Sequence, residues 1–252
     1  MNQITPVVKQ LLIVNVIIFL AAYFFVPMLN VYFPLYYIEN PNFKIWQPIT
    51  HMFMHGGIMH ILFNMFALYS FGSVLEQIWG GKKFILFYIL CGLGAAVLYA
   101  AVNYWQFHST YDVLLTNGFK TDDILNLISQ NRYDNRWLSY VSTDDIRSMS
   151  GSYFSRAVGA SGAIYGLLIA FAFMFPNAGL ALLFIPVPVK AKYFVPAILL
   201  YDLLSGLNGS SIFGFGGGVA HFAHIGGAIV GFLLMWMWKK KQFDQFRWDK
   251  RN

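Results

Sequence analysis

Six long apolar runs divide the chain, and most of its charged residues lie between or after them. These runs cover residues 7–29, 57–77, 82–105, 161–175, 193–207 and 218–238. A helix needs about 20 predominantly apolar residues to cross a bilayer core of about 30 Å, and the shorter runs approach that length with help from neighbouring loops. The pattern predicts an all-α membrane protein built as a bundle of six transmembrane helices.

The first apolar run has to be distinguished from a cleavable secretory signal. It is about twenty residues long, its basic flank is Lys9 alone, and no small-x-small cleavage site follows it. We therefore predict that 7–29 is a retained transmembrane helix.

Composition agrees with a membrane protein, because 58% of the residues are hydrophobic and 11% are charged, whereas in soluble domains about a quarter of the residues are charged.

If the six runs alternate in direction, one side of the membrane receives 11 of the 17 Lys and Arg residues. These are Lys9, Lys82, Lys83, Lys190, Lys192, Lys239, Lys240, Lys241, Arg247, Lys250 and Arg251. Cytoplasmic loops are enriched in Lys and Arg, so we predict cytoplasmic termini, with 239–252 a basic tail, in a bacterial inner membrane.

The net charge of +6 is explained by this topology and by contact with the anionic lipids of the bilayer. No nucleic-acid partner is predicted, because the basic residues lack the interleaved aromatic residues that single-strand binding needs. The lone Cys91 excludes an internal disulfide.

Residues 106–156 are the most polar stretch and hold six Asp and five Lys or Arg residues. We expect an extramembrane insertion on the outer side, between the third and fourth helices. Thr121 and Thr143 are each followed by two Asp residues, which is typical of an N-cap with acids in the first helical turn. Two short amphipathic helices are therefore predicted there. An inserted loop is the favoured interpretation, and a platform for a substrate or partner is the alternative.

Polar side chains inside a bilayer are costly and so are functional candidates. Those in or beside the apolar runs are His51, His55, His60, Asn64, Ser161, Asp202, His221 and His224. At a rise of 1.5 Å per residue, Ser161 and His224 each lie about 9 Å below the outer face, and His60 and Asn64 lie at a similar depth. One polar layer is therefore predicted near the outer surface.

Two G-x-x-x-G patterns predict that the helices carrying Ser161 and His224 pack closely. The patterns consist of Gly162 and Gly166 after Ser161, and of Gly227 and Gly231 after His224. Facing stripes of small residues would bring the serine and the histidine within hydrogen-bond range. The alternative is that the glycines serve only helix packing and that Ser161 and His224 are incidental. This alternative explains one stripe alone well, but it explains the two stripes together poorly.

Ser161 and His224 have the chemistry of a nucleophile and its base, because a neutral imidazole can take the serine proton. The backbone N–H of Ser161 at a helix start, together with His60 and Asn64, would supply donors for an oxyanion. Tyr165 lies one turn after Ser161 and either stacks on the imidazole or is a core aromatic. Since no carboxylate is evident to orient His224, a dyad is predicted.

Histidine boxes of a membrane metalloenzyme are a rival interpretation. It is disfavoured because there is no H-E-x-x-H motif and no clustered carboxylate to complete a metal site. A transporter would show inverted repeats, and no internal repeat is visible. An inactive binding protein of the same fold is a third alternative. We predict no metal and no cofactor.

Three motifs, in their order along the chain, resemble the rhomboid intramembrane proteases. They are the H-x-x-x-x-H-x-x-x-N pattern of His55, His60 and Asn64, then Gly159-Ala160-Ser161-Gly162, and then Ala223-His224-Ile225-Gly226-Gly227 with Gly231. The resemblance implies a serine endopeptidase with a Ser161–His224 dyad, an oxyanion hole of His60, Asn64 and the Ser161 N–H, and Tyr165 stacked on the histidine. It further implies cleavage of transmembrane segments of other membrane proteins near the outer face of the bilayer.

The resemblance also implies a mobile cap at 208–217 and a substrate gate at the fifth helix. This sequence departs from the family at Trp46-Gln47, where many members have Trp-Arg, which puts the anchor of the first outer loop in doubt. The insertion at 106–156 is longer than usual. Asp202 matches no motif of the family, and we interpret it as a structural polar residue.

Overall fold

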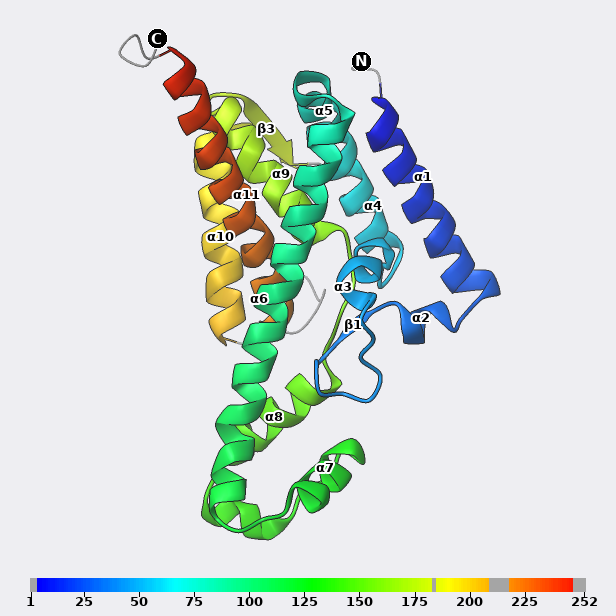
Figure 1. The fold of residues 1–252 in the computed structure, drawn as a ribbon, viewed down its shortest axis with the longest axis vertical. Helices are drawn as coiled ribbons and strands as arrows, with labels where there is room; N and C mark the ends of the chain where they lie inside the picture. The colour runs from blue at the N-terminus through cyan, green and yellow to red at the C-terminus, as the bar shows by residue number, and fades with distance from the viewer. Residues whose placement is uncertain (1–3, 183–184, 209–217, 247–252) are drawn as a thin grey trace.

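The computed structural model describes residues 4–182, 185–208 and 218–246, and helices dominate it (Figure 1). The predicted cap at 208–217 lies outside the described residues except for Asn208, as does the end of the basic tail at 247–252. Helices occur at all six predicted runs. They are α1 (Pro6–Leu20) with η1 (Ala21–Phe25), α4 (Ile58–Ala67) with η3 (Leu68–Gly72) and α5 (Ser73–Trp79), α6 (Gly81–Thr116), α9 (Ser161–Met174), α10 (Ala191–Asn208) and α11 (Gly218–Phe246).

Among the described residues, four helical segments are long and apolar enough to cross a membrane: Pro6–Phe25, Ile58–Trp79, Gly81–Thr116 and Ala220–Trp238. Helix α9 is a shorter apolar helix of 14 residues. The predicted all-α membrane architecture is confirmed, whereas six crossings stay a prediction.

Helix α6 differs from its predicted bounds, because it ends at Thr116 and not near residue 105. The first residues of the expected insertion are therefore helical. Phe107, Tyr111 and Leu114 are buried at spacings of four and three residues and form an apolar stripe that packs on the extramembrane segment. Polar residues between them hid this periodicity in the sequence. Two residues beyond the end of the helix, Gly118 has a left-handed φ of 88°, which is typical of a helix terminus.

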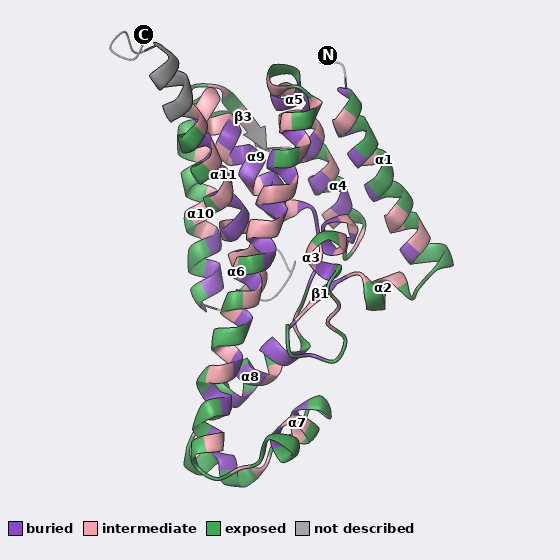
Figure 2. Ribbon diagram, in the orientation of Figure 1, coloured by how far each residue is buried: buried purple, intermediate pink, exposed green. Residues whose placement is uncertain are grey.

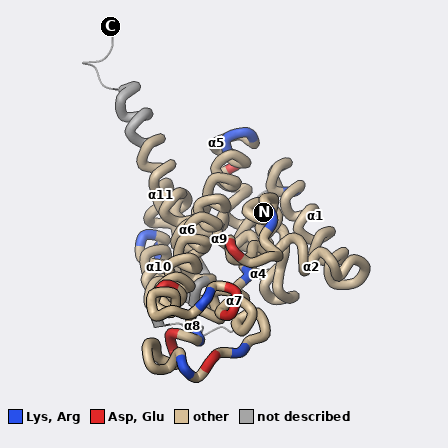
Figure 3. The backbone as a smooth tube through the Cα atoms, turned by 60° about the horizontal axis from the view of Figure 1, so that its bottom comes forward, with Lys and Arg blue, Asp and Glu red and all other residues tan. Residues whose placement is uncertain are grey.

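The segment predicted to lie outside the membrane holds α7 (Thr121–Ser129), the 3-10 helix η4 (Asn135–Ser139) and α8 (Thr143–Phe154). Both predicted amphipathic helices are present. Trp137, Ile124, Ile128 and Met149 form a small core with the stripe on α6. Acidic and basic side chains alternate along this segment, while most of the helical bundle carries neither (Figure 3).

The cap of α8 differs from the prediction, because it is Ser142 and not Thr143. The Ser142 hydroxyl accepts a hydrogen bond from the Asp145 N–H at 3.1 Å, and the Ser142 N–H donates to the Asp145 carboxylate at 2.9 Å. This reciprocal pair is a capping box. Helix α7 begins at Thr121, but its cap residue, Lys120, makes no side-chain hydrogen bond.

The first outer loop contains α2 (Leu29–Tyr32), β1 (Leu35–Tyr36), α3 (Gln47–Thr50) and η2 (His51–Phe53). Gln47 is fully buried and anchors it. Its amide nitrogen donates to the carbonyls of Asn42 at 2.9 Å and Tyr32 at 3.2 Å, and its oxygen accepts from the Tyr36 N–H at 3.3 Å. A neutral amide at position 47 therefore anchors this loop.

Two short antiparallel strand pairs complete the fold. Strand β1 pairs with β2 (Arg156–Ala157), which joins the first outer loop to the segment leading into α9. Strands β3 (Gly179–Leu182) and β4 (Ile185–Lys190) form a second pair between α9 and α10.

Buried residues concentrate on α9 and on the neighbouring faces of α6 and α11, while α1 and α10 are exposed along much of their length (Figure 2). Large apolar side chains such as Ile17 on α1 and Leu207 on α10 are 59% and 67% exposed. Extended apolar surface of this kind is suited to contact with lipid.

Glu76 fixes the start of α1. This buried carboxylate of α5 accepts hydrogen bonds from the N–H groups of Val7 at 2.9 Å and Val8 at 2.8 Å, and from the Thr5 hydroxyl. A negative charge is favoured at a helix N-terminus, so Glu76 ties α1 to α5.

Replacing Ser142 tests the capping box. Ser142→Ala should cost about 1 kcal/mol of helix stability and raise the hydrogen-exchange rate of the first-turn amides of α8, with Ser148→Ala on the same helix as the control. Hydrogen bonds from Ser142 lower the pKa of Asp145. The cap should therefore persist above the unfolded value of about 3.9 and weaken as the pH falls through the lower folded pKa. Equal exchange in both variants would contradict the capping role.

Candidate active site

The backbone before α9 places Ser161 at the first residue of that helix. Gly159 has a φ of 123°, a left-handed conformation that favours glycine, and its N–H donates to the carbonyl of His51 at 2.9 Å. The Ser161 N–H is therefore among the N-terminal amides that an α-helix cannot satisfy internally. Among the described residues it has no hydrogen-bond acceptor, which makes it a candidate donor to an anion.

His224 of α11 meets Ser161 directly. Its Nε2 lies 2.9 Å from the Ser161 Oγ, and the Tyr165 ring stacks on the imidazole with centroids 4.3 Å apart and planes at 11°. The stacked arrangement, one of the two weighed for Tyr165, is the one in the structure. The three side chains come from facing turns of α9 and α11.

Glycine contacts allow this approach. A Cβ on Gly227 would lie 1.8 Å from the carbonyl oxygen of Gly162, and one on Gly231 would lie 2.7 Å from the Cα of Gly166. No side chain fits at either position, so the two G-x-x-x-G stripes face each other as predicted. The backbones of α9 and α11 touch next to the serine and histidine.

The oxyanion-hole candidates His60 and Asn64 lie on α4, one turn apart. The Nδ1 of His60 accepts from the Gly56 N–H at 3.2 Å, so in a neutral ring the Nε2 carries the proton. That Nε2 would be 2.8 Å from a Cβ on Gly159, and the Ser161 Oγ would be 3.5 Å from the same point. A donor therefore faces the space beside the serine.

Asn64 and His55 have supporting contacts. The Asn64 amide donates one hydrogen to the His60 carbonyl at 2.9 Å, and the amide has a second hydrogen to donate. His55 is buried and packs edge-on against His60, with ring centroids 5.2 Å apart. Both residues thus help to hold α4 and His60 in place.

Asp202 of α10 was predicted to be a structural polar residue, and no carboxylate was expected beside His224. The structure corrects the second of these expectations. The Asp202 Oδ1 lies 3.3 Å from the Nδ1 of His224 and 2.5 Å from the Nδ1 of His221. The sequence held a signal, because Asp202 and Glu76 are the two acids within the six apolar runs. Their separation of 22 positions along the chain hid their proximity.

Asp202, His221 and His224 are also the group of described residues whose ligand atoms, within 4.8 Å of one another, could hold a metal. A carboxylate and two imidazoles suit Zn²⁺. However, the Oδ1 of Asp202 already forms hydrogen bonds with both imidazole rings, so hydrogen bonding explains the arrangement without a metal ion. The absence of a metal stays a prediction.

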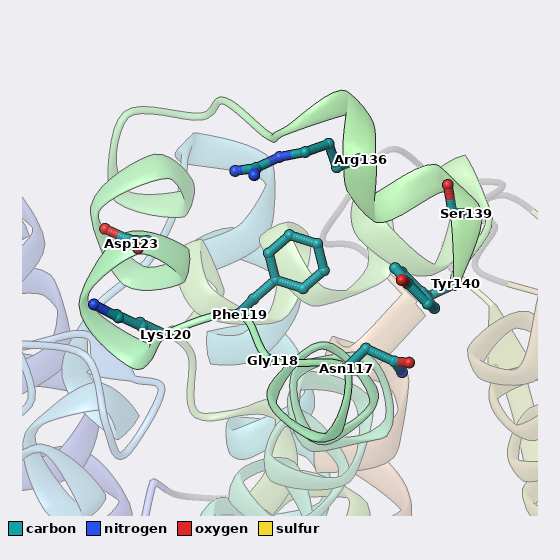
Figure 4. Close-up of a pocket in the computed structure, with 8 residues that line it drawn as sticks. All are labelled: Asn117, Gly118, Phe119, Lys120, Asp123, Arg136, Ser139 and Tyr140. Carbon is teal, nitrogen blue, oxygen red and sulfur yellow. The ribbon is translucent and has the colours of Figure 1, made fainter.

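A hollow of about 480 Å³ opens far from this site, on the extramembrane segment between the end of α6, α7 and η4 (Figure 4). Arg136 lies over the Phe119 ring there, 5.6 Å from its centroid, and pairs with Asp134. The hollow contains none of the predicted site residues. The hollow is therefore separate from the candidate site in the helical bundle.

Gly227→Ala tests the helix contact. The added methyl would clash with the Gly162 carbonyl, and overpacking costs about 1–3 kcal/mol, so the thermal unfolding midpoint in detergent should fall. Gly151→Ala is the control, since a Cβ there meets nothing within 4 Å. Equal midpoints for the two variants would show that α9 and α11 do not touch at Gly227.

Comparison with known proteins identifies the family. The rhomboid domain profile matches residues 42–109 and 137–241, more than half of the chain. The chain is 30% identical over 199 residues to the rhomboid protease AarA of Providencia stuartii, covering 75% of this chain and 54% of that protein. It is also 30% identical over 211 residues to an uncharacterized mitochondrial rhomboid protein of Schizosaccharomyces pombe, covering 78% of this chain and 52% of that protein.

A shorter match of 52 residues is 37% identical to the rhomboid protease GlpG of Salmonella newport and covers 21% of this chain and 19% of that protein. The chain spans about half the length of the first two relatives. The profile leaves out 110–136, which lie inside the predicted insertion. The apolar helices and the profile together show that this integral membrane protein belongs to the rhomboid family.

Proposed function

We propose that this protein is an intramembrane serine endopeptidase that cleaves transmembrane segments of other membrane proteins. One observation carries the proposal: the Ser161 Oγ lies 2.9 Å from the His224 Nε2 between two helices in contact. Polar side chains such as serine and histidine are costly in a membrane unless they are used. Two relatives are named rhomboid proteases, which supports the same activity.

The proposed reaction is acyl transfer. His224 Nε2 takes the proton of Ser161 as its Oγ attacks the scissile carbonyl, and the resulting imidazolium gives that proton to the leaving amine. An acyl-enzyme remains on Ser161. Water, deprotonated by His224, then releases the new carboxyl end and restores the serine. The reaction needs no metal or cofactor.

Three donors support the tetrahedral intermediate in this proposal. The Ser161 N–H lies at the positive end of α9, and the His60 Nε2–H faces the same space beside Gly159. Asn64 adds its remaining amide hydrogen. Loss of one oxyanion donor costs about 2.7–4 kcal/mol in a soluble serine protease, so the three together would contribute a large part of the rate acceleration.

Substrate entry beside α10 fits this geometry. Strand β2 ends four residues before Ser161, so the serine lies directly below the outer loops. Helix α10 presents exposed leucines such as Leu200 and Leu204 at its surface. We propose that a substrate helix approaches from the lipid along α10 and is cut near the outer face.

Cleavage of a reporter protein with one transmembrane helix, in liposomes, tests the activity. Wild type should cut the reporter with EDTA present, while Ser161→Ala and His224→Ala should each lose all cleavage, because the nucleophile or its base is missing. Gly151→Ala should cleave like the wild type. An inactive, well-folded wild type would favour the binding-protein alternative, and EDTA-sensitive cleavage would favour a metal at Asp202, His221 and His224.

We further propose that both termini are cytoplasmic, in a bacterial inner membrane. The support is the excess of Lys and Arg on one side of the predicted topology, although relatives include both bacterial and mitochondrial proteins. A green fluorescent protein fused to the C-terminus should fluoresce in bacterial cells, since green fluorescent protein does not fold after export and would stay dark outside the cytoplasm. An active alkaline phosphatase fusion at the same point would contradict the topology.

A further inference from the structure

Asp202 ends a continuous chain of polar contacts that leads to the serine. Its Oδ1 lies 3.3 Å from His224 Nδ1, and the opposite nitrogen of that ring lies 2.9 Å from Ser161 Oγ. The carboxylate is 2% exposed. Three helices, α10, α11 and α9, each contribute one member of this chain.

The carboxylate dictates which ring nitrogen of His224 carries the proton. An ionised carboxylate only accepts hydrogen bonds, so the Nδ1 opposite it must donate. In a neutral ring the Nε2 then has its lone pair directed at the Ser161 hydroxyl. The other tautomer would place a proton on Nε2 and leave the ring unable to act as base.

His221 holds this carboxylate in place. Its Nδ1 lies 2.5 Å from the same Oδ1, and its ring is 6% exposed. A buried carboxylate is costly unless it is paired and hydrogen-bonded, and two imidazole nitrogens meet that need at Oδ1, while Oδ2 has no hydrogen-bond partner among the described residues. Since His221 precedes His224 by one turn of α11, both rings approach Asp202 from the same helix.

We propose that Asp202, held by His221, is a positioning residue that orients His224 and balances the charge of its imidazolium during the reaction. The site is then a carboxylate–histidine–serine chain and not the predicted dyad. This inference rests on the proposed protease function. Other groups facing His224 are Tyr165 from α9 and His60 from α4, and neither is an anion that could replace the carboxylate.

Two substitutions test the carboxylate as acceptor. Asp202→Ala removes the acceptor, so the Nδ1 proton of His224 should no longer be held. Asp202→Asn keeps the size of the side chain but can turn its amide NH2 toward the Nδ1, which favours the tautomer with the proton on Nε2, so kcat should fall. Loss of the triad aspartate costs about 10⁴-fold in a soluble serine protease. Here we expect kcat to fall by about 10²-fold, because the 3.3 Å contact between Asp202 and His224 is longer than a typical N–H···O bond.

The experiment combines nitrogen-15 NMR of histidine-labelled full-length protein in detergent with kcat and KM for the transmembrane reporter. The His224 signal is assigned by its loss in His224→Gln. Wild type should show a protonated Nδ1, Asp202→Ala should lose it, and Asp202→Asn should lower kcat with KM and the unfolding midpoint unchanged. Asp202→Glu should restore part of kcat, and Ser205→Ala, another buried polar position on α10, should behave like wild type.

Two results would overturn the inference: a protonated Nδ1 that persists in a folded Asp202→Ala variant, or a wild-type kcat in Asp202→Asn. The NMR arm does not depend on cleavage. An inactive wild type whose tautomer depends on Asp202 would therefore count against the protease function and in favour of the positioning contact.

Discussion

Direct backbone contact between α9 and α11 is the constraint on which the rest of the site depends. Lipid provides little hydrophobic force for bringing helices together, so close packing of small residues has to supply the attraction. Gly162 and Gly227 meet with no space for a Cβ, and Gly166 and Gly231 repeat the contact one turn further on. Only at this separation can a side chain as short as serine reach the imidazole of the facing helix.

The outer loops hold the other end of the site. His51 fixes Gly159 through its carbonyl, and the β1–β2 pair joins the first outer loop to the segment before Ser161. Buried Gln47 anchors that loop with three hydrogen bonds. The start of α9, and with it the free Ser161 N–H, is therefore set by residues more than 100 positions earlier in the chain. This connection explains how a helix can begin with its donors directed at a reaction centre.

Much of this arrangement could be predicted from the sequence, because helices in a membrane satisfy their own backbone and leave a clear apolar signal. The contact between the two glycine stripes could also be predicted, since glycines four residues apart lie on the same face of a helix. The end of α6 was missed, because the stripe of Phe107, Tyr111 and Leu114 is embedded among polar residues. The contact of Asp202 with His224 was not predicted, since it depends on how α10 packs against α11, which local patterns do not encode.

The central claim is that His224 activates Ser161 within the membrane, and covalent labelling tests it most directly. Purified protein is treated with a fluorophosphonate, which reacts with activated serines, and the modified peptide is identified by mass spectrometry. The account predicts one adduct, on Ser161, that is absent in Ser161→Ala and strongly reduced in His224→Ala. A folded wild type that remains unlabelled, or an adduct on another serine, would contradict it.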